Sequence, residues 1–207
     1  MINNSRYEHA ASGGFIAGAA VSSAPDAGPP GDAGAGDSRA SCAALGEKHE
    51  RKNTVMMQTE RIRIYPASRT QMESLLSAEQ DDELRKAYGE MLRGSLAHPD
   101  DRDWYAVWLI EKTDGTHIGD LCFKGFEAGR NPEIGYGILE EFRCRGYAAE
   151  AVRLALRWAF RRPEVKAVEA ETDPGNTASQ RVLEKCGFRP MEITGEEGPR
   201  FIKYKGE

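Results

Sequence analysis

The sequence predicts an α+β fold in αβα layers, in which a mixed, mostly antiparallel sheet carries helices on both faces. Three observations support this prediction. The first half of the folded part contains short apolar strands joined by turns, including a hairpin turn at residues 113–115. Strand and helix patterns then alternate twice along the chain. Two more strand-like segments close the sequence.

Residues 1–55 differ in composition from the rest of the chain. Residues 10–45 are dominated by Ala, Gly, Ser and Pro. Such a segment buries too little apolar surface to offset the entropy lost on ordering. The apolar run at residues 15–21 resembles the centre of a signal peptide, but Gly18 interrupts it and it is too short to span a bilayer. We therefore expect a disordered extension over residues 1–55 and one folded domain over residues 56–207.

The first half of this domain is expected to combine one strand, two helices and a β-hairpin. Residues 61–67 form the strand, with Ile62 and Ile64 on one face. Typical N-cap residues precede each helix: Ser68 or Thr70 the first, and Asp81 or Asp82 the second. The two hairpin strands are expected at residues 104–111 and 117–123.

The second half is expected to contain two strand–helix units and a closing hairpin. The strands lie at residues 133–139 and 166–172, and the helices that follow them at residues 147–162 and 176–186. Pro163 ends the first helix, and Gly187 ends the second. The closing hairpin joins residues 188–193 to residues 200–205.

Composition and cysteine usage limit the possible functions. The formal net charge of -5 and the pI of about 5.5 give no overall basic field for nucleic acid. The four cysteines, Cys42, Cys122, Cys144 and Cys186, form no Cys-x-x-Cys pair and have no His at metal-ligand spacing. We therefore expect no metal site, no disulfide framework, no membrane partner and a cytoplasmic location.

The turn between residues 139 and 148 has features of an anion site. The first N–H groups of a helix lack intrahelical partners, and the helix dipole makes that end electropositive. Gly146 can adopt a backbone angle closed to other residues, and Ala148 keeps the approach small. Arg143 and Arg145 add positive charge. The turn therefore suits a phosphate or diphosphate, although an ordinary strand-to-helix connection with two solvated arginines remains the alternative.

A second stretch, residues 168–188, gives the turn its context. Together the two stretches resemble the GNAT acyl-CoA N-acyltransferases, and most closely the branch that acetylates N-termini of ribosomal proteins (RimJ/RimL-like). The resemblance covers about residues 58–205. It is carried by Glu-Ile-Gly-Tyr at residues 133–136, by Arg143-x-x-Gly146-x-Ala148, by Asn176-x-x-Ser179, and by the helix ending Glu184-Lys185-x-Gly187-Phe188.

The resemblance implies a fold and a co-substrate. Two parallel central strands would be splayed apart, and the pantetheine arm of acetyl-CoA would fill the gap and bond to backbone near Ile138 and Leu139. No metal is implied. The diphosphate would lie on the loop formed by Arg143, Arg145, Gly146, Tyr147 and Ala148. Asn176 would contact the pantetheine amide, or serve only as a helix N-cap.

The catalytic residues are less strongly indicated. Glu133 is the first choice of general base, with Asp120 second and Glu171 third, although Glu133 is equally explained as a solvated carboxylate at a strand end. Many family members protonate the leaving thiolate with a Tyr, but that position holds Leu183 here. Ser179 is the available hydroxyl, and it could instead bond the backbone of its own helix.

We therefore expect an acetyl-CoA-dependent N-acetyltransferase that works by direct attack in a ternary complex. The acceptor would be a primary amine, either a small molecule or a protein or peptide N-terminus, and the enzyme a monomer or homodimer. One alternative is a non-catalytic acyl-CoA-binding or sensing module. The other is a phosphate-binding protein unrelated to CoA, which the absence of a Walker-type Gly-x-x-x-x-Gly-Lys-Ser/Thr motif disfavours.

Overall fold

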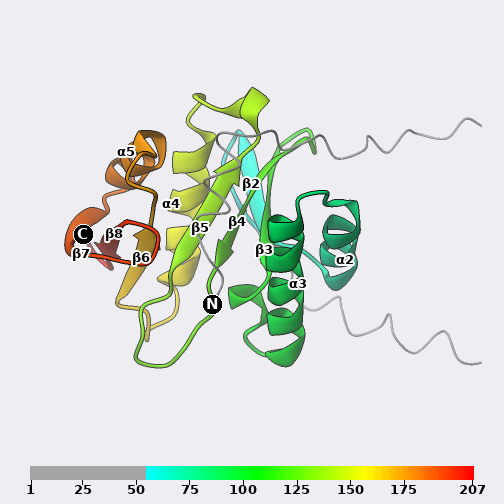
Figure 1. Cartoon of the computed structure of the whole chain (residues 1–207), viewed down its shortest axis with the longest axis horizontal. Helices are drawn as coiled ribbons and strands as arrows, with labels where there is room; N and C mark the ends of the chain where they lie inside the picture. Colours follow the sequence, from blue (N-terminus) through cyan, green and yellow to red (C-terminus); the bar gives the residue numbers. More distant parts are fainter. Residues whose placement is uncertain (1–54) are drawn as a thin grey trace, which may run out of the picture. The chain divides into compact units, whose positions relative to one another are not determined.

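The computed structural model describes residues 55–207, so the predicted extension falls, except for Val55, outside the described residues. Two sheets are present in this part of the chain. The larger has the strand order β1-β2-β3-β4-β5, and the smaller has the order β6-β8-β7, with antiparallel neighbours throughout both sheets. The predicted α+β class is therefore confirmed (Figure 1).

The elements follow the order expected from the sequence. The strands are β1 (Met57–Gln58), β2 (Ile62–Pro66), β3 (Val107–Lys112), β4 (His117–Phe123), β5 (Ile134–Ile138), β6 (Ala167–Glu171), β7 (Arg189–Thr194) and β8 (Pro199–Tyr204). The α-helices are α2 (Arg69–Ala78), α3 (Asp82–Ala97), α4 (Tyr147–Ala159) and α5 (Thr177–Lys185). Short 3-10 turns occupy Arg102–Trp104 and Glu140–Phe142.

Helix starts match the predicted caps. Ser68 caps α2 and forms a capping box with Gln71. Asp81 caps α3 by accepting a hydrogen bond of 2.8 Å from the amide of Leu84. Both caps satisfy amides that would otherwise lack partners, so the local sequence fixes where these helices begin.

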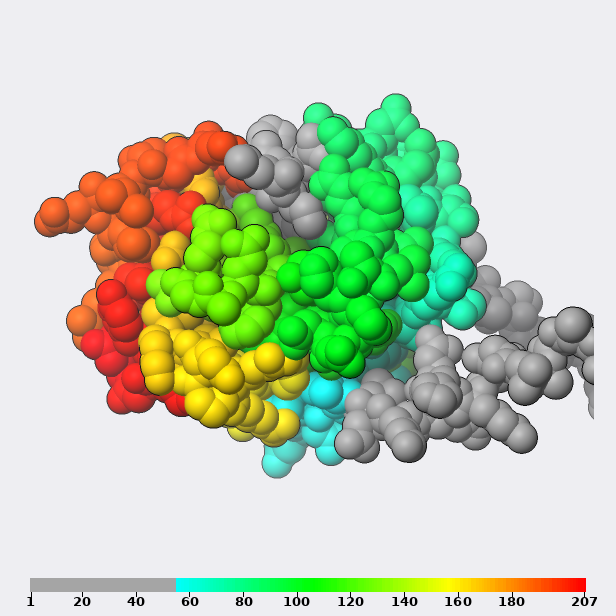
Figure 2. Space-filling model, turned by 90° about the horizontal axis from the view of Figure 1, so that it is seen from below, coloured from blue at the N-terminus to red at the C-terminus, as the bar shows by residue number. Residues whose placement is uncertain are grey.

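Helices cover both faces of the larger sheet, and each face has its own core. One core joins α4 to strand residues such as Ile64, Trp108 and Leu121. The other joins α2 and α3 to residues such as Leu109 and Cys122. In Figure 2 the cyan segment that holds β1 and β2 lies next to the yellow segment that holds α4, in keeping with their contacts in the structure. The sheet is thus held rigidly between helices, which is what a precise site on its edge requires.

Three differences from the sequence-based prediction are larger than one residue. The strand expected from residue 104 begins only at Val107, because Trp104 lies in a 3-10 turn and packs against Phe123 and Trp158. Helix α4 ends at Ala159 rather than at residue 162. The two-residue strand β1 was not predicted, since it is too short to show a period. Within residues 55–207, none of the helices combines the length and the apolar character needed to cross a membrane.

Candidate active site

The candidate site lies where the two sheets part. Strands β5 and β6 run parallel and meet at one bridge, between Glu133 and Glu169. The Glu169 amide there donates to the Pro132 carbonyl over 2.9 Å. Beyond the bridge β5 pairs only with β4 and β6 only with β8. The splayed parallel pair implied by the family resemblance is therefore present.

The splay exposes one edge of β5 to the gap. The Leu139 amide donates to the Ile118 carbonyl, and the Glu133 carbonyl accepts from the Lys124 amide, each over 2.9 Å. Because backbone groups alternate in direction along a strand, the groups of Tyr136 and Ile138 face the gap instead. Of the two residues predicted to bond pantetheine, only Ile138 thus presents its backbone there. The Leu139 carbonyl already accepts from the Phe142 amide.

A cavity of about 360 Å³ adjoins this edge. Strand β5, the corner at residues 142–149 and the first turns of α5 line it, together with Gly119 and Asp120 of β4. Most of the predicted cofactor-binding residues are in its wall: Ile138, Leu139, Arg143, Gly146, Tyr147, Ala148 and Asn176. Arg145 is not among the lining residues, and its guanidinium lies over the Phe142 ring at 5.8 Å.

The corner before α4 has the expected anion-site geometry. Gly146 is the N-cap residue at φ +83°, a left-handed conformation that favours glycine. Among the described residues, no side chain caps the helix. Its first amides therefore remain available for a ligand at the electropositive end of the helix. Cys144, two residues earlier, is exposed and also has a positive φ, of 60°.

The charge of the cavity wall suits a phosphate ligand. Arg143, Arg181 and Lys185 line it, and Asp120 is the one carboxylate among the lining residues. The Nε atom of Arg143 donates to the Ile138 carbonyl over 3.0 Å, which holds this side chain across the end of β5. Three cations in the cavity wall thus add positive charge to the field of the α4 dipole.

Helix α5 brings a pair of hydroxyl groups to the cavity. Asn176 caps the helix by accepting a hydrogen bond of 3.0 Å from the Ser179 amide. The Ser179 hydroxyl lies 3.0 Å from the phenol of Tyr136 on β5. Leu183, which stands at the usual Tyr position of the family, is fully buried in the core. Sequence reasoning missed Tyr136 as a site residue, although its place in β5 already put it on the central strand.

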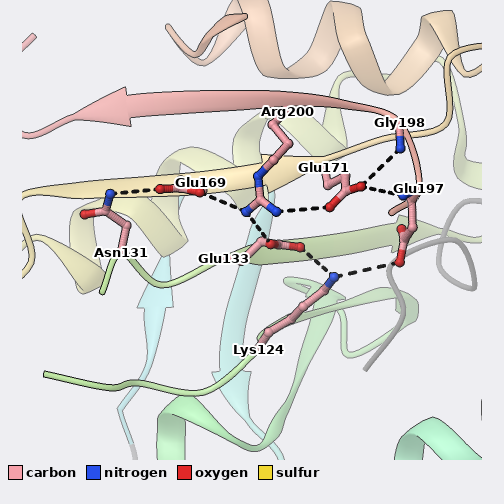
Figure 3. A network of polar contacts seen from close by, with 8 residues as sticks. All are labelled: Lys124, Asn131, Glu133, Glu169, Glu171, Glu197, Gly198 and Arg200. Carbon is pink, nitrogen blue, oxygen red and sulfur yellow. Dashed lines mark hydrogen bonds and ion pairs between the residues drawn. The ribbon is translucent and has the colours of Figure 1, made fainter. Parts of the chain in front are cut away.

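Glu133 lies at the bridge between the sheets and outside the cavity lining. It contacts Lys124 Nζ at 2.5 Å and Arg200 Nη2 at 2.8 Å, and Arg200 also reaches Glu169 and Glu171 (Figure 3). Both Glu133 oxygens are thus held by cations. A role as general base would require this network to open.

The other two carboxylates considered as bases have different surroundings. Glu171 accepts hydrogen bonds from the amides of Glu197 and Gly198 and forms an ion pair with Arg200 (Figure 3). It therefore organises the loop between β7 and β8. Asp120 is buried, lines the cavity and contacts Tyr88 and His117. Of the three candidates, only Asp120 is part of the cavity wall.

Comparison with known proteins supports a family assignment. Residues 51–189 match the family model described as "Acetyltransferase (GNAT) domain". The chain is 36% identical over 84 residues to the uncharacterized N-acetyltransferase YjdG of Bacillus subtilis, which covers 39% of this chain and 49% of that protein. It is 44% identical over 86 residues to the uncharacterized protein YkkB of the same organism, covering 40% and 50%. The matched span is thus about half the length of these curated relatives.

Solved structures share the fold. An acetyltransferase of the GNAT family from Bacillus anthracis aligns with a TM-score of 0.56 at 19% identity, covering 74% of this chain and all of that one. RimL, a ribosomal L7/L12 alpha-N-protein acetyltransferase, aligns in its complex with coenzyme A with a TM-score of 0.59 at 14% identity, covering 72% and 98%. The family match over residues 51–189, together with the splayed strands and the cavity beside β5, shows that the chain belongs to the GNAT acetyltransferase family.

Proposed function

We propose that the protein is an N-acetyltransferase that transfers the acetyl group of acetyl-CoA to a primary amine by direct attack in a ternary complex. The observation that carries this proposal is the cavity at the splay, where the open edge of β5 meets the uncapped amides of α4. A long ligand with a diphosphate at one end and amides along its arm matches these two features.

The residues divide into three roles under this proposal. The α4 amides at Gly146, Tyr147 and Ala148, with Arg143, hold the diphosphate, while Arg145 contributes charge from outside the lining. The backbone at Ile138 bonds the pantetheine amides, with Leu139 lining the arm and Asn176 contacting it from α5. Arg181 and Lys185 reach the adenosine phosphates.

Transfer itself needs few chemical groups. Holding the thioester and the amine in line supplies most of the rate enhancement. The departing thiolate takes a proton from Ser179, whose hydroxyl lies 3.0 Å from that of Tyr136. Tyr136 thus supplies a phenol near the thiolate even though Leu183 replaces the usual Tyr, which favours an enzyme over a non-catalytic acyl-CoA-binding module.

The acceptor is proposed to be a protein or peptide N-terminus or a small amine. The RimL structures support the first class, since RimL is named as an alpha-N-protein acetyltransferase. A cytoplasmic location is proposed as well, supported by the free thiols of Cys144 and Cys186. Light scattering on the purified chain would separate a monomer from a homodimer.

Thiol release from acetyl-CoA tests the proposed activity. The panel consists of short peptides that begin with Ser, Ala or Met and of small alkyl amines, with mass spectrometry of each product. We expect release of one thiol per acetylated amine, and Ser179→Ala to slow turnover by about 100-fold. Binding of CoA without thiol release across the panel would instead favour the non-catalytic module. Glu133→Gln in the same assay tests the role of Glu133 as base.

A further inference from the structure

Asp120 is a buried carboxylate in the cavity wall. Its side chain is only 3% exposed, yet it lines the same cavity as the α4 corner and Ser179. On β5 its direct partner is Gly137. Paired residues on neighbouring strands point to the same face of a sheet. Because Gly137 has no side chain, the space over β5 between Asp120 and the gap stays open.

Two neighbours hold both carboxylate oxygens of Asp120. The Tyr88 hydroxyl, from α3, donates to Oδ2 over 3.1 Å, and Nε2 of His117 lies 2.9 Å from Oδ1. Burial, reinforced by the charge of Asp120, raises the pKa of Tyr88 well above its usual value. Tyr88 therefore stays protonated and acts as a fixed donor that orients the carboxylate.

His117 connects this carboxylate to solvent. Its side chain is 34% exposed, while that of Asp120 is 3% exposed. Burial disfavours the imidazolium, but the hydrogen bond and charge of Asp120, together with the Gly119 backbone, raise the pKa of His117 above its usual value. Glu111 of β3 also faces His117 and acts in the same direction, and Glu111 is itself paired with Arg63 and Tyr65 of β2. The Asp120–His117 pair thus extends from the cavity to the surface.

The location on the sheet also fits an acceptor. Asp120 lies on the face covered by α2 and α3, as shown by its bond to Tyr88. Helix α4 packs on the opposite face of the sheet, and its first turn lines the same cavity as Asp120. An amine that approaches from the α2–α3 face would therefore meet Asp120 before it reaches a thioester held along β5.

We propose that Asp120 is the general base that deprotonates the acceptor ammonium, and that His117 passes this proton to solvent. The inference rests on the proposed transferase function. The ammonium gives one proton to Asp120, and His117 relays it to water. The neutral nitrogen then attacks the thioester carbonyl carbon, so that the C–N bond forms and the C–S bond breaks. The second nitrogen proton leaves with the thiolate, by way of Ser179, as CoA thiol.

This assignment differs from the one based on Glu133. Glu133 is held by Lys124 and Arg200 and is not part of the cavity wall, whereas Asp120 is part of it and has a titratable partner leading to solvent. His117 acts through Asp120 and is a positioning and relay residue. Its role predicts a pH effect on turnover that a purely structural histidine would not produce.

The experiment compares Asp120→Asn and His117→Gln with the matched controls Asp114→Asn and His98→Gln, both on exposed side chains away from the cavity. Turnover of acetyl-CoA is followed with three acceptors: a six-residue peptide that begins with Ser, ethylamine, and 2,2,2-trifluoroethylamine. Ethylamine and trifluoroethylamine are similar in size, but trifluoroethylamine is far less basic and is already neutral at the assay pH. Calorimetry with CoA measures cofactor binding separately.

We expect Asp120→Asn to lower kcat about 100-fold with the peptide and with ethylamine. The loss with trifluoroethylamine should be less than about 10-fold, since that amine needs no base before it attacks. CoA affinity should stay within about twofold of the wild type, and the two controls should keep wild-type turnover. In the wild type, kcat should rise with pH, because only neutral His117 can accept the proton from Asp120. In His117→Gln this rise of kcat should be absent.

Two results would overturn the inference while leaving the transferase intact. The first is an Asp120→Asn variant whose kcat falls by the same factor with ethylamine and with trifluoroethylamine. The second is His117→Gln with an unchanged pH profile, and this test holds even where Asp120→Asn fails to fold. A wild-type chain that binds CoA but releases no thiol with any of the three amines would instead overturn the proposed function, and the inference with it.

Discussion

Arg200 joins the two sheets at the point where they meet. It lies on β8 and contacts Glu133, Glu169 and Glu171 at 2.8, 2.8 and 3.2 Å (Figure 3). Glu133 precedes β5, while the other two carboxylates are on β6. In Arg200→Met the three carboxylates would lose the cation that they share, while Lys124 would remain at Glu133. We therefore expect this substitution to destabilise the domain.

The size of the effect follows from burial. Breaking a buried ion pair by removing one partner costs about 3–5 kcal/mol. The Arg200 side chain is 22% exposed and that of Glu169 18%, so solvent screening reduces the expected loss to about 2–3 kcal/mol. For a domain of this size the melting temperature should then fall by about 5–10 °C.

Urea unfolding followed by circular dichroism measures this loss, with Arg189→Met as the control. Arg189 pairs with Glu207 at 3.2 Å, but the two side chains are 68% and 36% exposed, so its removal should change stability by less than about 0.5 kcal/mol. Adding Glu169→Gln to Arg200→Met should restore about 1 kcal/mol, because it removes one unpaired carboxylate. Equal losses for the Arg200 and Arg189 variants would show that Arg200 does not stabilise the junction of the two sheets.

Three further predictions concern the site. Gly146→Val should weaken CoA binding by about 10-fold, because valine opposes a left-handed N-cap by about 1–2 kcal/mol; the control is Gly129→Val, at φ +84° with nothing within 4 Å, and equal weakening in both would contradict the anion site. In Cys42→Ser protein, iodoacetamide should label exposed Cys144 first, and CoA should protect it because Cys144 lines the cavity; labelling unaffected by CoA would place the ligand elsewhere. Since the pKa of His117 is raised in the fold, its contribution to stability should be complete below about pH 6.5 and be lost as pH rises through the raised value. Urea unfolding should therefore show a larger gap between wild type and His117→Gln at about pH 5.5 than at about pH 8.5, and the reverse order would contradict the ion pair.

Much of the fold was predictable because its determinants are local. Ser68 and Asp81 mark the helix starts as N-cap residues do, and Gly146 is left-handed where the turn required it. The alternation of strand and helix periods after residue 132 predicted both units of the second half. The cavity wall contains most of the loop residues expected from the family pattern, since a short motif carries that loop.

The remaining features depend on contacts between distant parts of the chain. The sequence around Glu133 indicates a carboxylate at the end of a strand. Arg200, 67 residues later, contacts Glu133 only because of the fold. Tyr88 and Asp120 are 32 residues apart, and their bond depends on how α3 packs on the sheet. The pairing of Tyr136 with Ser179 likewise spans the gap between β5 and α5. No local period or spacing encodes such neighbours.

A crystal structure of the chain with bound CoA would show where the ligand lies. We expect the diphosphate within hydrogen-bonding distance of the amides at the start of α4, and the pantetheine arm between β5 and β6 with a bond to the backbone of Ile138. A CoA molecule bound outside the cavity, or strands β5 and β6 that close and pair along their length in its presence, would contradict this expectation.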